Sequence, residues 1–266
     1  MDPTWSSRSI SPLRHGWKML VENSSSGKVH KKIKVEGKEL SCPPLEVFTL
    51  DDMKILKMSP ERESCLTYQM NFVPRQIGCL RNLTTLYLDT NNLEQVPPEV
   101  GTLRCLQRLT LSNNLLRCLP PELAKLQNLQ SVHLANNNFE TFPTVLCQLL
   151  NLTFLDLSDN EIESIPRSIQ QLRKLNTFLL VLNLLTHLPE EFCCLKKLSC
   201  LWLGSNRLQK LPARFGDLAM LDWGSNYCSY NIEGNPLHCP PLEVCNKGPK
   251  EINGYFECCK LYDVPQ

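Results

Sequence analysis

The sequence lacks long hydrophobic segments and an excess of either charge. No stretch approaches the ~20 apolar residues of a membrane span, and the first residues contain no apolar run of signal-peptide length. We therefore expect a protein without membrane contact, located in the cytoplasm, with the nucleus as the alternative. The 28 basic and 27 acidic residues leave a net charge of +1, which does not predict a nucleic-acid partner.

The motifs of the common catalytic sites are also missing. The sequence has no glycine-rich phosphate loop, no nucleophile elbow and no HExxH zinc motif. It has no arrangement of cysteine, histidine and asparagine that folding would bring together as a protease site. We therefore predict that the protein is not an enzyme and has no cofactor.

Cysteine is abundant, but its spacing does not predict a disulfide framework. The fourteen cysteines are scattered along the chain, so we expect free thiols in a reducing compartment. Zinc modules use two close pairs of ligands, a spacing that the cysteines near the C-terminus do not have. We therefore predict no metal site in the strongest candidate group, His238, Cys239, Cys245, Cys258 and Cys259, and zinc binding by this group stays a less favoured alternative.

A 23-residue repeat dominates the sequence. With each opening leucine numbered as position 1, positions 4, 6, 11, 14 and 21 are also apolar in every copy. The alternation at positions 4 and 6 predicts a short strand with one buried face. One copy cannot bury its own apolar residues, so we expect the copies to fold only as a stack. The opening leucines are Leu83, Leu106, Leu129, Leu152, Leu175 and Leu198.

Positions 9 and 15 are as regular as the leucines. Position 9 is asparagine in all six copies, from Asn91 to Asn206. We expect its amide to hydrogen-bond main-chain groups that are left free where each strand ends. Position 15 is proline, from Pro97 to Pro212. Proline disfavours a helical residue before it, which predicts an extended segment and then a short helical or irregular return path.

The pattern LxxLxLxxNxLxxLP, seen from Leu106 to Pro120 and from Leu152 to Pro166, resembles that of leucine-rich-repeat proteins. From about Lys31 to the C-terminus, the sequence is similar to the intracellular 23-residue class of the Ras-suppressor and Scribble/Erbin-like proteins. The resemblance implies an α/β solenoid curved into a horseshoe, with short parallel strands on its concave face. It also suggests small GTPases, phosphatases, ubiquitin-ligase components or cytoskeletal adaptors as partners.

The repeats become irregular toward both ends of the array. We assign residues 1–29 to a flexible basic leader, 30–248 to about nine repeats, and 249–266 to a C-terminal helical cap and tail. In the second copy the proline, Pro74, arrives seven residues late, and we place the extra residues in a loop at 59–65. A second irregular coil is expected at 218–229, after which the solenoid resumes.

Positions 3 and 5 alternate with the buried strand positions and are predicted to point outward on the concave face. Several of these outward residues are aromatic or aliphatic, and charged residues lie between them, a mixture typical of protein interfaces. We predict that a monomer of this chain binds a partner protein there. The expected site residues are Tyr87, Arg108, His133, Phe154, Asp156, Leu179, Val181 and Trp202, with Leu182 beside them.

Other functions stay open beside this protein-binding adaptor. The protein is alternatively a structural scaffold subunit whose concave face is permanently filled. The aromatic residues of the strip alternatively pack on neighbouring side chains without a partner. Basic residues are in excess before Leu40 and give a weaker case for a nucleic-acid ligand, because the serines at 24–26 make this segment resemble a flexible leader.

Overall fold

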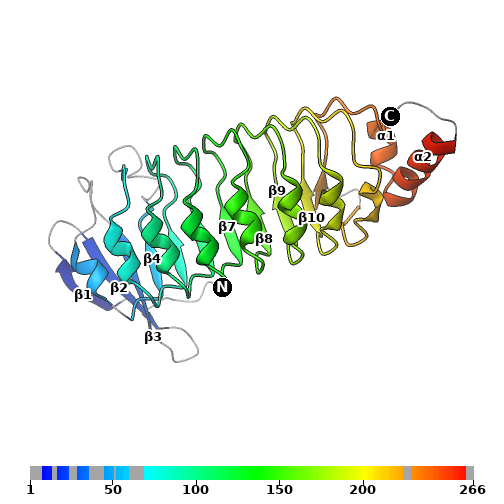
Figure 1. Ribbon diagram of the computed structural model, residues 1–266. Coiled ribbons are helices and arrows are strands. Elements are labelled where there is room, and N and C mark those ends of the chain that lie inside the picture. The colour runs from blue at the N-terminus through cyan, green and yellow to red at the C-terminus, as the bar shows by residue number, and fades with distance from the viewer. Residues whose placement is uncertain are drawn as a thin grey trace. The chain divides into compact units, whose positions relative to one another are not determined.

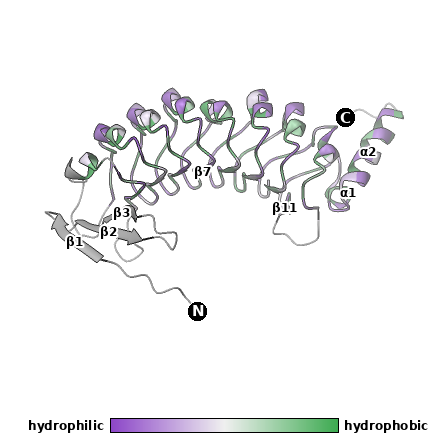
Figure 2. Cartoon of the chain, turned by 90° about the horizontal axis from the view of Figure 1, so that it is seen from below, coloured by the Kyte–Doolittle hydropathy of each residue, from purple (hydrophilic) through white to green (hydrophobic). Residues whose placement is uncertain are grey.

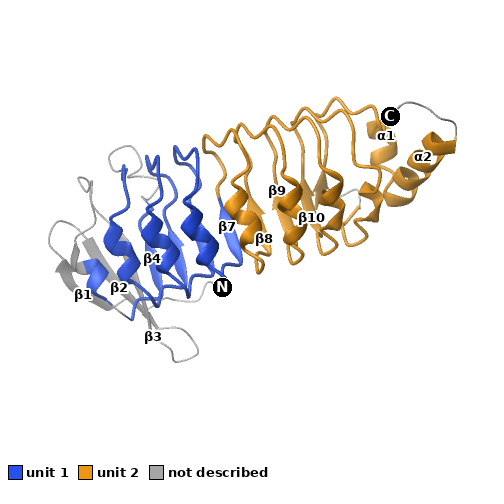
Figure 3. Cartoon of the chain, in the orientation of Figure 1, with its two compact units in different colours: residues 1–133 blue, residues 134–266 orange. Residues whose placement is uncertain are grey.

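The computed structural model describes residues 8–13, 17–23, 29–35, 45–50, 52–59, 69–223 and 229–261, with the backbone alone before residue 47. The chain divides into two compact units, Met1–His133 and Leu134–Gln266, which are coloured blue and orange in Figure 3. Each unit is a stack of coils with a short strand on one side and a short helix on another (Figure 1). No helix within the described ranges is long and apolar enough to cross a membrane.

Unit 1 begins with strands that the sequence analysis did not anticipate. In the part of the chain assigned to a leader, strands β1 (Arg8–Leu13) and β2 (Trp17–Asn23) pair antiparallel, and β2 pairs in the same way with β3 (Val29–Val35). Strand β3 then pairs parallel with the first strand of the regular stack. The parallel strands that follow are β4 (Ile55–Lys57), β5 (Thr85–Tyr87), β6 (Arg108–Thr110) and β7 (Ser131–His133).

Unit 2 continues the same alternation of strand and short helix. Its parallel strands, in pairing order, are β8 (Phe154–Asp156), β9 (Thr177–Leu179), β10 (Cys200–Trp202) and β11 (Tyr230–Asn231). Two α-helices, α1 (Leu242–Cys245) and α2 (Pro249–Leu261), follow the last strand. The 3-10 helices of the two units are η1 (Leu45–Thr49), η2 (Arg75–Cys79), η3 (Pro98–Thr102), η4 (Pro121–Lys125), η5 (Thr144–Gln148), η6 (Arg167–Gln171), η7 (Glu190–Cys194) and η8 (Phe215–Asp217).

The strand register confirms the 23-residue repeat. In unit 1, Leu86 pairs with Leu109, which is the position 4 residue of the next copy. In unit 2, Leu155 pairs with Phe178, and Phe178 pairs with Leu201. All of these side chains are buried, as are their position 6 neighbours. Equal spacing in the sequence therefore places equivalent apolar residues one above another in each core.

The predicted return path is a 3-10 helix in every regular copy. Pro97 has φ −67° and ψ 143°, which is extended backbone, and η3 starts immediately after it. The N–H of Leu103 closes the helix by donating to the carbonyl oxygen of Val100 at 3.0 Å, and both of these side chains are buried. Figure 2 shows hydrophobic and hydrophilic residues on the same short helices, as expected for elements with one side in the core.

The asparagines at position 9 connect neighbouring coils, as predicted. Asn160 donates from Nδ2 to the carbonyl oxygens of Leu134 at 3.1 Å and Leu157 at 3.0 Å, and its Oδ1 accepts the N–H of Phe139 at 3.2 Å. The side chain thus bonds its own coil and the preceding one while it is almost completely buried. Equivalent bonds are made by Asn91, Asn114, Asn183 and Asn206.

The seven extra residues of the second copy lie between Met58 and Met70. The N–H of Met70 donates to Asn91 Oδ1 at 2.9 Å, the bond that position 11 makes in the regular copies. Val73 and Pro74 are buried in the places of positions 14 and 15. Most of the predicted loop at 59–65 falls outside the described residues, but regular packing resumes by Met70.

The stack also resumes after the second irregular coil. Leu201 pairs with Tyr230, 29 residues later instead of 23, so six extra residues lie between these two strands. Asn235 then takes the role of position 9, because its Nδ2 donates to the carbonyl oxygen of Leu203 at 2.9 Å. Residues 224–228, in the predicted irregular segment at 218–229, lie outside the described residues.

Helix α2 spans the segment whose apolar residues have helical spacing. Ile252 and Phe256 are buried on one side of it, whereas Leu261 at its end is 80% exposed. The helix packs closely against η8, since a Cβ added at Gly216 would lie 2.6 Å from the carbonyl oxygen of Pro249. Glycine at this position lets α2 approach the last coils of unit 2.

Candidate binding face

The outward strand positions form one face of each sheet. In most of the short strands the central residue is buried and the two flanking residues are half-buried. Strand β6 differs, because Arg108 is exposed while Thr110 is buried and its hydroxyl donates to the carboxylate of Asp89. The same carboxylate accepts the N–H of Ser112 at 2.9 Å. Thr110 is therefore held by its neighbours in unit 1.

Unit 1 carries three residues of the predicted strip. Tyr87 and His133 are half-buried, and each pairs with Thr110 from opposite sides, so they flank it on the same face. His133 Nε2 lies 2.9 Å from the hydroxyl of Ser131 on the same strand. Arg108 occupies the other outward position of β6, two residues before Thr110, and is exposed. This part of the face is polar, and the phenol ring of Tyr87 is its main apolar surface.

Unit 2 carries the apolar part of the strip. Asp156, Leu179 and Trp202 are paired in register on β8, β9 and β10, and all three are half-buried. Adjacent strands lie about 4.8 Å apart, so Leu179 lies directly between the carboxylate and the indole. Phe154 occupies the other outward position of β8 and pairs with Thr177. Asp156 Oδ1 accepts the N–H of Ser158 at 3.0 Å, which orients its carboxylate.

The turn that follows β9 extends the apolar part. Val181 is half-buried and Leu182 is 53% exposed. Leu184, which the sequence analysis did not include, is half-buried two residues farther along. The repeat could have indicated this residue, because Leu184 is apolar at position 10, where the copies on either side have Glu161 and Arg207. Unit 2 thus carries Phe154, Asp156, Leu179 and Trp202 at the outward positions of adjacent strands, with Val181 in the turn that follows β9.

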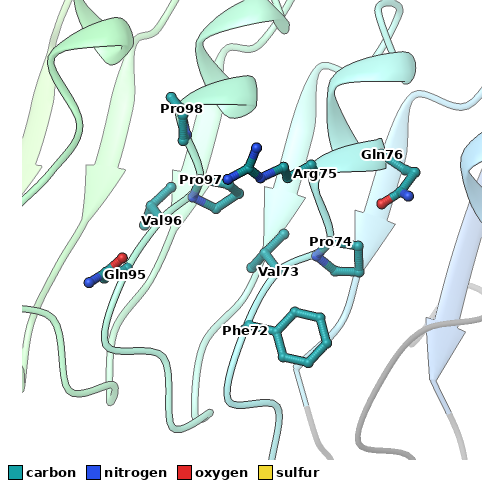
Figure 4. A pocket seen from close by; sticks show the side chains of 9 residues that line it. All are labelled: Phe72, Val73, Pro74, Arg75, Gln76, Gln95, Val96, Pro97 and Pro98. Atoms are coloured by element: carbon teal, nitrogen blue, oxygen red, sulfur yellow. The ribbon is translucent and has the colours of Figure 1, made fainter.

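A pocket in unit 1 was not predicted. It has a volume of about 570 Å³ and lies between the segments that lead into η2 and η3 (Figure 4). Phe72, which is 53% exposed, and three prolines give it apolar walls, and Arg75 forms an ion pair with Glu99 at 3.8 Å. The lining contains no nucleophile and no carboxylate. The residues that line it are Phe72, Val73, Pro74, Arg75, Gln76, Gln95, Val96, Pro97 and Pro98.

The described cysteines are free thiols, and four of them are buried. No disulfide links the eleven cysteines that lie in the described ranges. Burial raises the pKa of Cys193 to about 12, with a contribution from the charge of Glu190, and burial likewise raises the pKa of Cys245 to about 12. In the described part of the chain, no three histidine, cysteine or acidic side chains are placed to hold a metal ion.

Comparison with known proteins agrees with this architecture. A family model of the leucine-rich repeat matches residues 81–139 and 106–162. The plant peptide hormone receptor RGFR1 in complex with RGF2 is 25% identical over 77% of this chain and 32% of its own, with a TM-score of 0.63. A TDR receptor structure is 27% identical over 74% of this chain and 33% of its own, with a TM-score of 0.61.

A third structure supports the fold alone. It is an internalin of Listeria monocytogenes, 20% identical over 77% of this chain and 55% of its own, with a TM-score of 0.63. No relative was found among curated protein sequences. This chain spans between 32% and 55% of the length of the three structures. Residues 81–162 match the leucine-rich-repeat family, and the stacked parallel strands and 3-10 helices have the fold of a leucine-rich-repeat solenoid.

Proposed function

We propose that the protein is a non-catalytic binding module that holds a partner protein on the outward face of its strands. One observation carries the proposal: Phe154, Leu179 and Trp202 point outward on adjacent strands of unit 2. Side chains in these positions do not help to fill the core, which the residues at positions 4 and 6 complete.

Apolar side chains on an outward face favour association. Each one gains free energy when a partner removes it from water, by roughly 25 cal/mol for each Å² of apolar surface. Leu179 lies between Asp156 and Trp202, so a carboxylate and an indole ring flank the apolar centre of the face. An apolar centre with polar groups at its margin is the usual anatomy of a protein interface.

The comparisons support a protein ligand in general terms. The receptor RGFR1, with which this chain shares 25% identity and the repeat fold, is in complex with RGF2. The resemblance to intracellular repeat proteins suggests a small GTPase, a phosphatase, a ubiquitin-ligase component or a cytoskeletal adaptor as the partner. We further propose that the module acts as a monomer in the cytoplasm, with the nucleus as the alternative.

The proposal is tested by altering the strand face and an unrelated surface in parallel. Tagged protein is used to capture partners from cells, and captured proteins are quantified by mass spectrometry. Trp202→Ala, Phe154→Ala and Leu179→Arg should each reduce capture about 30-fold, the equivalent of about 2 kcal/mol for an interface anchor. The circular-dichroism spectrum and Tm should change little, because these side chains are half-buried.

Two charge reversals serve as controls. Lys125 and Arg173 are exposed, away from the strand face, and Lys125→Glu and Arg173→Glu should leave capture unchanged. If these two variants abolish capture while the strand-face variants retain it, the proposed face is wrong. If the strand-face variants unfold the protein, their side chains are structural and the binding proposal fails for them.

A further inference from the structure

One turn of unit 2 has an unusual residue at a strained position. Position 8 of each regular copy has positive φ, between 53° and 60°. This left-handed conformation is disfavoured for most L-residues and is best tolerated by glycine, asparagine and aspartate. Leu182 adopts it with φ 58° and is 53% exposed. The equivalent residues of the other copies are all polar: Thr90, Asn113, Asn136, Asp159 and Ser205.

Apolar residues occupy the turn around Leu182 and the outward positions of the strands beside it. Its N–H donates to the carbonyl oxygen of Gly204 at 3.1 Å, and the N–H of Leu180 donates to that of Trp202 at 2.8 Å, so this turn and β10 are directly bonded. The flanking copies have polar residues or glycine where this copy has Val181 and Leu182. We define the Leu182 patch as Leu179, Val181, Leu182, Leu184 and Trp202.

Carboxylates border the patch along the preceding coil. Asp156 pairs with Leu179. The N–H of Asp159 donates to the carbonyl oxygen of Val181 at 2.8 Å, which places Asp159 beside the Leu182 turn. Glu161 occupies the position next to Leu184. Within the described ranges, none of these three carboxylates forms an ion pair.

The opposite border is less charged. Ser205 and Arg207 follow β10 at the positions that correspond to Asp159 and Glu161. The patch is therefore bordered by three carboxylates on one side and by the single guanidinium of Arg207 on the other. A ligand that covers the apolar centre meets a net negative border, and opposite charge on the ligand is favoured there.

We infer that the Leu182 patch binds a protein segment that presents apolar side chains next to lysine or arginine. This inference rests on the proposed function and specifies the chemistry of the partner and the place of its main anchor. An exposed leucine in a strained turn contributes little to the fold, whereas it gives a partner an accessible apolar contact. The acidic border disfavours nucleic acid and anionic membranes, because their phosphates would be repelled.

The experiment uses a random dodecapeptide library displayed on phage and selected on the full chain. Enriched peptides are synthesised with a fluorescent label, and their affinities are measured by fluorescence polarisation. We expect the enriched sequences to combine leucine, isoleucine, phenylalanine or tryptophan with lysine or arginine. Enrichment of acidic peptides would overturn the inferred partner chemistry.

A relaxed variant separates binding from folding. Leu182→Asn replaces the leucine with a residue that tolerates positive φ, so we expect the Tm to stay within about 2 °C of the unmodified protein or to rise. Affinity for the enriched peptides should fall at least about 10-fold. Leu150→Asn is the matched control, because Leu150 is 50% exposed in the same unit but lies on a turn before β8. It should not change the affinity.

The acidic border is tested separately. The double variant Asp159→Asn, Glu161→Gln should weaken peptide binding several-fold and make the affinity less sensitive to salt between about 0.05 and 0.5 M. The double variant Glu251→Gln, Glu257→Gln, at two exposed positions of α2, is the charge-matched control and should have no effect. Unchanged affinity and salt dependence in the double variant would overturn the role of the border.

The outcomes distinguish this inference from the proposed function. If peptide binding is lost in Phe154→Ala and Trp202→Ala but retained in Leu182→Asn, the strand face binds and the inference about Leu182 is wrong. If all of these variants bind normally, or if selection enriches no peptide on the unmodified protein relative to Leu182→Asn, the Leu182 patch is not the docking site. Normal binding by every strand-face variant would also overturn the proposed function.

Discussion

Replacing Asn160 with alanine should destabilise unit 2 without changing its fold. Asn160 is almost completely buried and bonds two coils. Alanine keeps the backbone conformation available but removes both the amide donor and the carbonyl acceptor. The substitution therefore removes only the hydrogen bonds that the Asn160 side chain makes to main-chain groups.

The magnitude follows from which main-chain groups keep another partner. The carbonyl oxygens of Leu134, Leu157 and Ser158 retain donors after the change, namely Asn137 Nδ2 at 3.0 Å, Asn183 Nδ2 at 2.9 Å and the N–H of Asn136 at 2.9 Å. The N–H of Phe139 has only Asn160 Oδ1 as its acceptor, at 3.2 Å. One buried donor without a partner costs about 1 to 3 kcal/mol, which we expect as the loss in the free energy of unfolding.

Urea unfolding followed by circular dichroism and by tryptophan fluorescence measures this loss. The midpoint should fall while the slope with urea stays constant, since the surface exposed on unfolding is unchanged. Asn176→Ala is the matched control. Asn176 is exposed, and its Nδ2 reaches the carbonyl oxygen of Lys197 only at 3.4 Å. Its removal should change the free energy by less than about 0.5 kcal/mol.

An unchanged midpoint for Asn160→Ala would refute the reasoning. It would mean that water or a shifted backbone satisfies the N–H of Phe139, so that the ladder of asparagines does not stabilise the stack. A loss equal to that of Asn176→Ala would lead to the same conclusion. The two variants together therefore decide whether burial of the amide is what matters.

Further expectations concern the end of the stack and the thiols. Gly216→Ala should loosen α2, because the new Cβ would lie 2.6 Å from the carbonyl oxygen of Pro249 and would also contact Asn253 Oδ1. We expect a lower Tm and faster proteolysis of α2. An unchanged Tm and proteolysis rate would contradict the close packing of α2. Burial raises the pKa of Cys193 to about 12, so at pH 8 only about one in ten thousand of its thiols is ionised. Iodoacetamide should therefore modify Cys193 only after unfolding. Exposed Cys79, Cys105 and Cys118 should react first in the native protein, and early labelling of Cys193 would contradict its burial. After denaturation in the absence of reductant, protein from reducing cells should show all fourteen thiols, and disulfides in most molecules would overturn the cytoplasmic proposal.

The regular part of the fold was predictable because its information is local and repeated. Alternation at positions 4 and 6 indicated which side of each strand is buried, and the six asparagines indicated where main-chain groups needed a partner. Proline at position 15 similarly indicated the start of each return path. Each of these features depends on residues within one copy, so a single sequence was enough to predict it.

The N-terminal strands and the pocket were not predictable in the same way. Strands β1 and β2 pair antiparallel in a segment without the repeat, so periodicity gave no indication of them. Phe72 lines the pocket from the copy with seven extra residues, and the repeat pattern of that copy gave no indication of a pocket. The hydrogen bond between Met70 and Asn91 links two copies and shows that the regular packing has returned by Met70.

For the candidate binding face, the sequence by itself determined which side chains point outward in each strand, because the two-residue period of a strand assigns them to one face. It did not determine that Leu182 adopts a left-handed conformation, because this φ is set by the hydrogen bonds that the turn makes with Gly204 and Asn160 in the neighbouring coils. Nor did it place Asp159 beside Val181, since residues 22 positions apart become neighbours only when the coils stack. Tertiary structure therefore decided the chemistry around the patch, because that chemistry arises between copies.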